Sequence, residues 1–278
     1  MIYLSEIYNS IQGEGKFSGE LSTFIRLMGC CLNCPFCDTK WTWRESEPQP
    51  NEPLLFDNSD KISSFIDDYY KNINIYPKNV VITGGEPLLI ENINTLYFLI
   101  KDLIYKYCDK LTFETTTLTD VEDIFASSMR KNLIYFNSTF SIKYQSGSNY
   151  LNFNNIYYSI SPKLQLFCYP PKTNVKFEDI LKYYSFNYDE YETLIDKNIK
   201  FYYKFVYVKK YEEDILKLID KLPCSFIPEI YLMPLTPNIW DKDKYSISCQ
   251  ETVNFCIKYG LNYSPRLHID LWGLKTGV

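Results

Sequence analysis

The sequence has little histidine and little glycine. Its 278 residues include one histidine, His268, and 10 glycines. A structural zinc site usually takes four cysteine or histidine ligands, so a zinc site that relied on histidine would have a single residue to draw on. Glycine is most informative where a backbone turns tightly or approaches a ligand closely.

An excess of positive charge and a long apolar run are also missing. The formal net charge is −5, which argues against broad, unspecific nucleic-acid binding because such binding needs a basic surface. No apolar run approaches the roughly 20 residues of a membrane helix. The first residues carry no basic segment of the kind that begins a secretory signal. We therefore expect a soluble cytoplasmic protein with no membrane partner and no direct nucleic-acid partner.

Internal repeats and a clear linker are absent from the sequence as well. Hydrophobic residues make up 46% and charged residues 23% of the chain, which are ordinary values for a globular protein. The length suits one substantial core. We therefore expect one domain over residues 1–278.

Runs of β-branched and aromatic residues alternate with amphipathic stretches along the chain. The expected strands are Phe24–Leu27, Val80–Thr83, Leu111–Thr115, Tyr157–Ser161, Phe201–Val208, Ile230–Met233 and Leu267–Leu271. Apolar residues at helical spacing predict helices over 62–69, 93–104, 215–222 and 253–257. The alternation predicts an α/β fold with a largely parallel sheet. Such sheets place ligands beyond the carboxyl ends of their strands.

Two stretches look like additions to this core. Residues 119–156 are mixed in character and become rich in Asn and Ser, and residues 169–198 contain many Tyr and acidic residues. We expect both to form surface insertions or a cap.

Four of the nine cysteines crowd into eight positions, from Cys30 to Cys37. Cys30, Cys34 and Cys37 form a C-x3-C-x2-C pattern, whose close spacing lets one loop wrap three thiolates around one inorganic centre. A closed ferredoxin-type cluster or a structural zinc site takes four ligands, so three leave one metal position open. Adjacent side chains tend to point in different directions, and we therefore do not expect Cys31 to be a ligand.

The spacing alone leaves three interpretations open. A 4Fe–4S cluster is favoured over the other two. The second is a zinc site that recruits Cys31 or a distant Cys or His, although the sequence has no second C-x2-C pair. The third is a loop that binds no metal.

Polar segments follow several of the expected strands. Gly84-Gly85-Glu86-Pro87 follows Thr83, and its two glycines permit close approach of the backbone to a ligand. Glu114-Thr115-Thr116, Ser161-Pro162-Lys163 and Met233-Pro234-Leu235-Thr236 follow three further strands. One such segment is a routine loop, but several in one chain indicate a shared site at one rim of the sheet.

The N-terminal region contributes a loop and a charged strand residue. Ser10-Ile11-Gln12-Gly13-Glu14-Gly15 forms a loop that contains two glycines, and Arg26 lies within an apolar strand. A buried guanidinium needs an anionic or hydrogen-bonding partner. A substrate carboxylate and a structural salt bridge fit Arg26 about equally well.

The C-x3-C-x2-C pattern resembles that of the radical S-adenosylmethionine (SAM) superfamily, and the whole chain resembles the 7-carboxy-7-deazaguanine synthase family. The resemblance rests on SIQGEG, FIRL, GCxLxCxxCDTxxTW, TGGEP, SPK, MP and RLHIDLWG, which are spread over nearly the whole chain. It implies a partial, open TIM-like barrel of the radical SAM type, with insertions. It also implies conversion of 6-carboxy-5,6,7,8-tetrahydropterin to 7-carboxy-7-deazaguanine with loss of ammonia, in queuosine-type 7-deazapurine biosynthesis.

The resemblance further implies cofactors, partners and site residues. In that superfamily the open iron of a three-cysteine 4Fe–4S cluster binds SAM, whose cleavage releases a 5′-deoxyadenosyl radical. For this chain it implies the cluster, SAM (which is regenerated), Mg²⁺, a pterin substrate, an external electron donor and a homodimer. The implied ligands are Cys30, Cys34 and Cys37 for the cluster, Thr39 for magnesium, Phe36, Asp38, Gly85, Glu86, Glu114, Ser161, Pro162, Lys163, Met233, Pro234, Leu235 and Thr236 for SAM, and Ile11, Gln12, Gly13, Arg26 and Thr83 for the pterin.

Two alternatives from the same residues stay open. Another radical SAM enzyme, such as a glycyl-radical activating enzyme, shares the cysteine pattern but does not require SIQGEG or LHIDLWG. A non-catalytic iron–sulfur or zinc module would need a fourth-ligand motif. The chemistry implied by the resemblance needs no histidine base, and we expect His268 to be a structural or pocket-wall residue.

Overall fold

The computed structural model describes residues 1–73, 75–140, 143–146, 149–152, 155–237 and 240–275. The strands are β1 (Ile2–Ile11), β2 (Leu21–Leu27), β3 (Leu54–Phe56), β4 (Asn79–Gly84), β5 (Lys110–Thr115), β6 (Lys143–Ser146), β7 (Asn149–Asn152), β8 (Ile156–Ile160), β9 (Lys200–Tyr207), β10 (Ile230–Pro234) and β11 (Asn262–Tyr263). The α-helices are α1 (Ser59–Ile73), α2 (Ile93–Lys106), α3 (Asp123–Ala126), α4 (Met129–Phe140), α5 (Phe177–Tyr184), α6 (Tyr188–Asp196), α7 (Glu212–Ile219), α8 (Lys242–Tyr259) and α9 (Leu267–Trp272).

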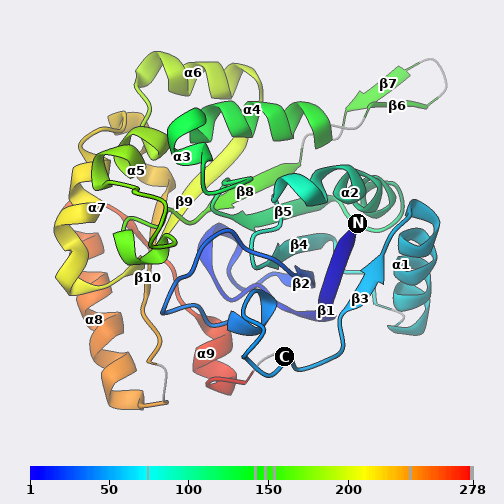
Figure 1. Cartoon of the computed structure of the whole chain (residues 1–278), viewed down its shortest axis with the longest axis horizontal. Coiled ribbons are helices and arrows are strands. Elements are labelled where there is room, and N and C mark those ends of the chain that lie inside the picture. Colours follow the sequence, from blue (N-terminus) through cyan, green and yellow to red (C-terminus); the bar gives the residue numbers. More distant parts are fainter. Residues whose placement is uncertain (74, 141–142, 147–148, 153–154, 238–239, 276–278) are drawn as a thin grey trace.

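One large sheet forms the centre of the molecule. Within the described ranges its strand order is β11-β10-β9-β8-β5-β4-β2-β1-β3. Every neighbouring pair from β2 to β11 is parallel, whereas β1 is antiparallel to both β2 and β3. Figure 1 shows the sheet curving, with α1, α2, α4, α7 and α8 placed around its outer side. The arrangement is a partial barrel whose two edge strands, β3 and β11, do not pair with each other.

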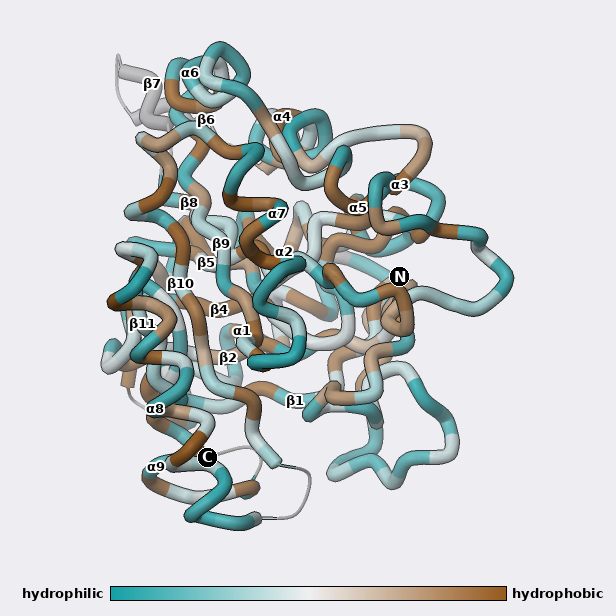
Figure 2. The backbone as a smooth tube through the Cα atoms, turned by 90° about the vertical axis from the view of Figure 1, so that its left-hand side faces the viewer, coloured by the Kyte–Doolittle hydropathy of each residue, from teal (hydrophilic) through white to brown (hydrophobic). Residues whose placement is uncertain are grey.

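The core lies between the sheet and these helices. Val80, Val81 and Ile82 of β4 are completely buried, as an apolar strand covered on both faces should be. Leu96 and Ile100, one helical turn apart on α2, are also completely buried. Each such side chain contributes about 1.5–3 kcal/mol on burial, so the sheet forms a firm base for the loops at its rim. Figure 2 shows the same pattern, with hydrophobic stretches on the strands and hydrophilic turns at the periphery.

The segments at 119–156 and 169–198 contain connections between parallel strands. The first runs from β5 to β8 and contains α4, whose Leu133 and Phe136 are fully buried. The second runs from β8 to β9 and contains α5 and α6, and the buried Tyr184 of α5 donates a hydrogen bond to the carbonyl of Thr116. Parallel neighbours need a crossover of this length. The β6–β7 hairpin extends from the first segment (Figure 1).

One predicted strand was wrong. Leu267–Leu271 is not a strand but the start of helix α9, Leu267–Trp272. A strand would place Leu267, Ile269 and Leu271 on one face, yet Ile269 is buried while Leu271 is 60% exposed. The edge next to β10 is already occupied by β11, and the amide of Leu267 donates instead to the carbonyl of Gly13 at 3.0 Å.

Among the described residues, no helix combines the length and the apolar character needed to cross a bilayer.

Candidate functional site

The segments predicted to share a site meet at the carboxyl ends of the parallel strands. The loops are tied directly to one another by backbone hydrogen bonds. The amide of Gly85, after β4, donates to Leu27 of β2 at 3.1 Å, and the amide of Glu86 donates to Gly29 at 2.7 Å. The amide of Ser161, after β8, donates to Thr115 of β5 at 2.8 Å. Neighbouring parallel strands therefore bring the cysteine loop, the GGEP segment and the SPK segment to one rim.

The cysteine loop begins where β2 ends. Cys34 is buried, and Cys30 and Cys37 are half-buried. The amide of Leu32 donates to Sγ of Cys30 at 3.4 Å, and the indole Nε1 of Trp43 donates to Sγ of Cys37 at 3.4 Å. Hydrogen bonds of this kind suit sulfur atoms that carry negative charge.

The loop offers three sulfur donors, the ligand type of iron–sulfur clusters. Burial raises the pKa of Cys30 to about 12, so a thiolate there needs a positive partner such as iron. Within the described part of the chain, no trio of His, Cys, Asp or Glu side chains is already gathered at metal-binding distance. The donor set fits a cluster that draws three thiolates of one loop together.

Gly85 permits the close contact between the GGEP segment and the cysteine loop. A Cβ atom at this position would lie 1.9 Å from the carbonyl oxygen of Gly29 and 3.1 Å from Cβ of Cys30. Real Cβ atoms do not approach a backbone oxygen so closely, so any other residue must displace the loop.

We expect Gly85→Ala to displace the cysteine loop and to reduce the iron that the protein retains. Overpacking of this kind costs about 1–3 kcal/mol. The measurement is iron per chain after anaerobic reconstitution, together with the free energy of unfolding. Gly19→Ala is the matched control, because a Cβ at Gly19 meets no atom within 4 Å. The φ of Gly19 is +94°, so this variant introduces backbone strain without a steric clash. Equal iron content in the two variants would contradict the role of Gly85.

Glu86 is turned toward the protein interior. Its side chain is 1% exposed, and its carboxylate accepts hydrogen bonds from the amide of Thr116 at 2.7 Å and from its hydroxyl at 2.6 Å. The hydroxyl of Thr115 and the amide of Leu88 also donate to it. Burial raises its pKa, and these hydrogen bonds oppose the rise. Glu86 thereby fastens the loop after β4 to the loop after β5.

A small pocket brings together residues from two of the segments predicted to contact SAM. Phe36 of the cysteine loop lines it with Pro162 and Lys163 of the loop after β8. The ammonium of Lys163 donates to Oγ of Ser161 at 2.6 Å. The ring of Phe36 also meets Phe167 edge-on, with centroids 6.3 Å apart.

The remaining predicted residues of the SAM side and the magnesium side lie on the same rim. Oγ1 of Thr39 is 3.6 Å from Sγ of Cys37, and Thr39 is nearly buried. Thr236 accepts a hydrogen bond from Arg266. Met233 and Pro234 end β10 and are buried, while Leu235 is half-buried.

The residues predicted for the pterin divide between a loop and the strands beside it. Gln12 is buried, and its Nε2 donates to Glu114 at 3.1 Å. Ile11 ends β1, and Thr83 lies in β4 with 7% of its surface exposed. Gly13 faces His268, because a Cβ at Gly13 would lie 2.2 Å from Nδ1 of the imidazole.

Arg26 forms a structural salt bridge, which was one of the two interactions expected for it. It stands directly across from Glu6 in the β1–β2 ladder, and its Nε donates to the Glu6 carboxylate at 2.6 Å. Its Nη2 donates to the hydroxyl of Tyr8 at 3.0 Å. Burial lowers the pKa of Arg26, but Tyr8 and Glu6 outweigh it and hold the pKa above its ordinary value.

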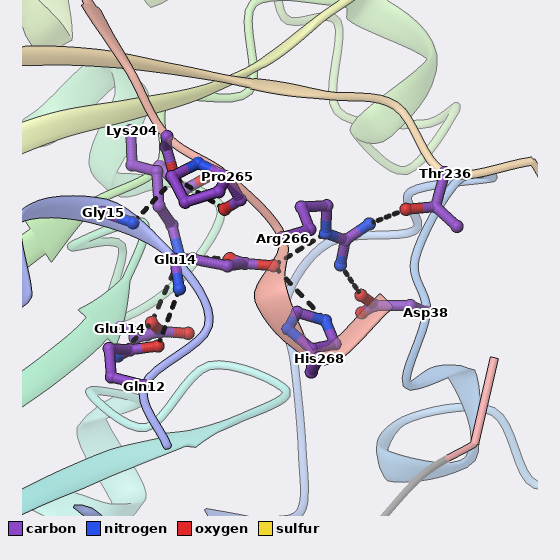
Figure 3. Close-up of polar contacts among 12 residues, drawn as sticks. Gln12, Glu14, Gly15, Asp38, Glu114, Lys204, Thr236, Pro265, Arg266 and His268 are labelled. Carbon is purple, nitrogen blue, oxygen red and sulfur yellow. Dashed lines mark hydrogen bonds and ion pairs between the residues drawn. The ribbon is translucent and has the colours of Figure 1, made fainter. Parts of the chain in front are cut away.

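Two charged residues that are not among the predicted site residues join these parts (Figure 3). Lys204 of β9 is 3% exposed and lies 2.6 Å from the Glu14 carboxylate and 3.1 Å from that of Glu114. Arg266 lies 2.8 Å from the other oxygen of Glu14 and 2.5 Å from Asp38. A charged residue inside the apolar run Phe201–Val208 was the available signal for Lys204.

A cavity also lies away from this rim. It has a volume of about 590 Å³ and is lined by Leu21, Asn79, Lys110 and Tyr157, among others, at the amino ends of the parallel strands. Ligands of parallel α/β sheets bind beyond the carboxyl ends. We therefore place the site at the rim with the cysteine loop rather than at this cavity.

Comparison with known proteins identifies the class of protein. The family described as "4Fe-4S single cluster domain" matches residues 11–151, half of the chain. The chain belongs to this family. Its cysteine loop, at the end of β2, lies within the matched region.

Individual relatives are more specific. The chain is 27% identical over 269 residues to 7-carboxy-7-deazaguanine synthase of Hyperthermus butylicus. The aligned region covers 95% of this chain and 90% of the relative. The chain is 34% identical over 141 residues to the enzyme of the same name from Clostridium acetobutylicum, covering 50% and 54% of the two chains. The crystal structure of QueE from Escherichia coli superposes with a TM-score of 0.52 and 20% identity, covering 95% and 92%. This likeness confirms the predicted fold, an open TIM-like barrel of the α/β class.

Proposed function

We propose that this protein is a radical SAM enzyme that converts 6-carboxy-5,6,7,8-tetrahydropterin to 7-carboxy-7-deazaguanine with loss of ammonia. The observation that carries the proposal is the three-cysteine loop at the end of β2, in a chain that belongs to a 4Fe-4S family. Similarity to a 7-carboxy-7-deazaguanine synthase over 95% of the chain supports the substrate. When bound, the cluster and SAM supply the radical that starts the reaction.

Cys30, Cys34 and Cys37 would hold the cluster in this proposal. SAM would lie along the rim between the cysteine loop and the ends of β4, β5, β8 and β10. Phe36, Pro162 and Lys163 lie together beside the cysteine loop and would line one side of SAM. The SAM contacts proposed are Phe36, Asp38, Gly85, Glu86, Glu114, Ser161, Pro162, Lys163, Met233, Pro234, Leu235 and Thr236.

The pterin would bind beside the loop after β1. Ile11, Gln12, Gly13, Arg26 and Thr83 are the contacts proposed. Two nitrogens of Arg26 already donate to Glu6 and Tyr8, so the guanidinium is held rigidly while its third nitrogen serves the substrate carboxylate. His268 would form the wall behind Gly13, and burial lowers its pKa, which favours a neutral ring at neutral pH.

Further parts of the proposal concern partners. Thr39 would contribute an oxygen ligand to Mg²⁺, which prefers oxygen donors and retains several waters. The reduction that starts each reaction needs an external electron donor. We also propose a homodimer that works in the cytoplasm, in line with the resemblance drawn from the sequence.

Anaerobic turnover tests the proposed function. Iron-loaded protein, SAM, a reductant and carboxytetrahydropterin are expected to yield 7-carboxy-7-deazaguanine and ammonia, measured by mass spectrometry, with more than one product formed per SAM. Cleavage of SAM without a deazaguanine product would reject the substrate and leave another radical SAM activity, such as activation of a glycyl-radical enzyme. Absence of SAM cleavage in fully iron-loaded protein would reject the radical SAM assignment itself.

A further inference from the structure

We propose that Arg266 is a positioning residue that holds Asp38 and Thr236, on the SAM side of the site, against Glu14 of the loop that binds the pterin. This inference rests on the proposed function, since it assigns Asp38 and Thr236 to the SAM side. It concerns a residue outside the cysteine loop and outside every contact proposed above.

Arg266 reaches three loops with one guanidinium (Figure 3). Its Nε donates to Glu14 at 2.8 Å, its Nη1 donates to the hydroxyl of Thr236, and its Nη2 donates to Asp38 at 2.5 Å. These partners follow β1, β10 and the third cysteine of the cysteine loop. A planar fork with several fixed donors can join three acceptors in this way, whereas a lysine ammonium has no such geometry.

Glu14 is fixed from two sides. Arg266 holds one carboxylate oxygen, and Lys204 holds the other at 2.6 Å. Burial raises the pKa of Glu14, but Lys204 and Arg266 outweigh it and hold that pKa well below its usual range. Glu14 therefore stays ionised and can serve as a rigid anchor for the guanidinium. Gln12, in the same loop, is linked to Lys204 through their shared acceptor, Glu114.

The backbone around Arg266 is held as firmly as its side chain. The hydroxyl of Ser264 accepts from the amide of Gly15 at 2.7 Å, and the amide of Ser264 donates to Leu232 of β10 at 2.8 Å. On the other side, the amide of Leu267 donates to Gly13 at 3.0 Å. Hydrogen bonds therefore hold the segment against the pterin loop on both sides of Arg266, and they fix the backbone from which the guanidinium extends.

Asp38 is the open end of this mostly buried network. The Arg266 side chain is 6% exposed, but 63% of the Asp38 side chain is open. A carboxylate that Arg266 holds in an open position is suited to accept hydrogen bonds from a ribose, which SAM carries.

The test is SAM affinity in Arg266→Gln, measured by equilibrium dialysis of cluster-loaded protein under anaerobic conditions. Loss of charge-assisted hydrogen bonds is expected to raise the Kd for SAM by about 10- to 100-fold. Arg266→Lys should recover part of that loss, because it restores the charge but not the fork. In turnover, KM for SAM should rise far more than kcat falls. Lys16→Gln is the matched control, since it removes a more exposed ion pair to Glu229 beside the same loop.

The outcomes separate this inference from the function on which it rests. A Kd within about twofold of the wild type in folded, iron-loaded Arg266→Gln would overturn the positioning role. If that variant does not fold, Thr236→Val removes one arm of the fork alone, and an unchanged Kd there would overturn the role in the same way. Failure of the wild-type protein to bind SAM would instead reject the proposed function.

Discussion

Cys34→Ala is expected to abolish SAM cleavage and to leave the protein without a stable 4Fe–4S cluster. With three cysteine ligands at hand, the loss of one leaves two thiolates and one more iron exposed to solvent. Even removal of a group that merely supports a metal ligand costs about 10- to 100-fold in metal affinity or activity, so we expect a loss of more than about 100-fold here. Iron and sulfide content, the absorption of the cluster and the amount of 5′-deoxyadenosine formed measure the effect.

Cys31→Ala is the control for this prediction. Cys31 is adjacent to Cys30, half-buried and outside the C-x3-C-x2-C pattern. We expect this variant to keep its iron and its SAM cleavage. Cleavage of SAM by Cys34→Ala at the rate of Cys31→Ala would overturn the cluster assignment.

Lys204→Met is expected to destabilise the fold more than a typical single substitution. Lys204 is buried between the carboxylates of Glu14 and Glu114, and its removal leaves two negative groups close together without their shared partner. Breaking a buried ion pair from one side costs about 3–5 kcal/mol. Lys16→Met, in the more exposed pair with Glu229, should cost no more than about 1 kcal/mol. Denaturant unfolding of both variants measures the difference.

The pH dependence of this loss follows from the pKa shifts. Burial lowers the pKa of Lys204, but Glu114 and Glu14 outweigh it and raise the pKa, so the lysine stays charged at all pH values below about 10.4. Glu14 has a lowered pKa, so its contribution is present above about pH 4.3 and fades as the pH falls toward its folded value. The loss of unfolding free energy in Lys204→Met should therefore become smaller as the pH falls from about 5 to about 3. A constant deficit over that range would contradict the pairing with Glu14.

The parts of the fold that could be predicted from the sequence have local signals. Val80–Thr83 is an uninterrupted apolar run before two glycines, and it is the buried strand β4. The strands Leu111–Thr115 and Ile230–Met233 were confirmed in the same way. The helix expected over 253–257 is the last part of α8, which Gly260 caps with a φ of +68°. The cysteine pattern could be recognised in the sequence as a metal-binding loop because that function depends on the spacing of the cysteines.

The remaining features depend on contacts between distant parts of the chain. Leu267–Leu271 alternates like a strand, but β11 occupies the sheet edge and the segment forms α9. Arg26 could be recognised as a buried charge, yet whether Glu6 would face it depended on the β1–β2 register. Arg266 and Glu14 are 252 positions apart, and neither position alone indicates the other. Glu14 and Arg266 lie in the motifs SIQGEG and RLHIDLWG, but only the fold brings the two side chains together.

The central claim, that Cys30, Cys34 and Cys37 hold a cluster with one iron open to SAM, is tested most directly by electron paramagnetic resonance. The reduced, iron-loaded protein should change its spectrum when SAM is added, and SAM labelled with ¹⁵N at its amino group should show coupling of that nitrogen to the cluster. An unchanged spectrum at saturating SAM, with no nitrogen coupling and four irons per chain, would contradict the claim.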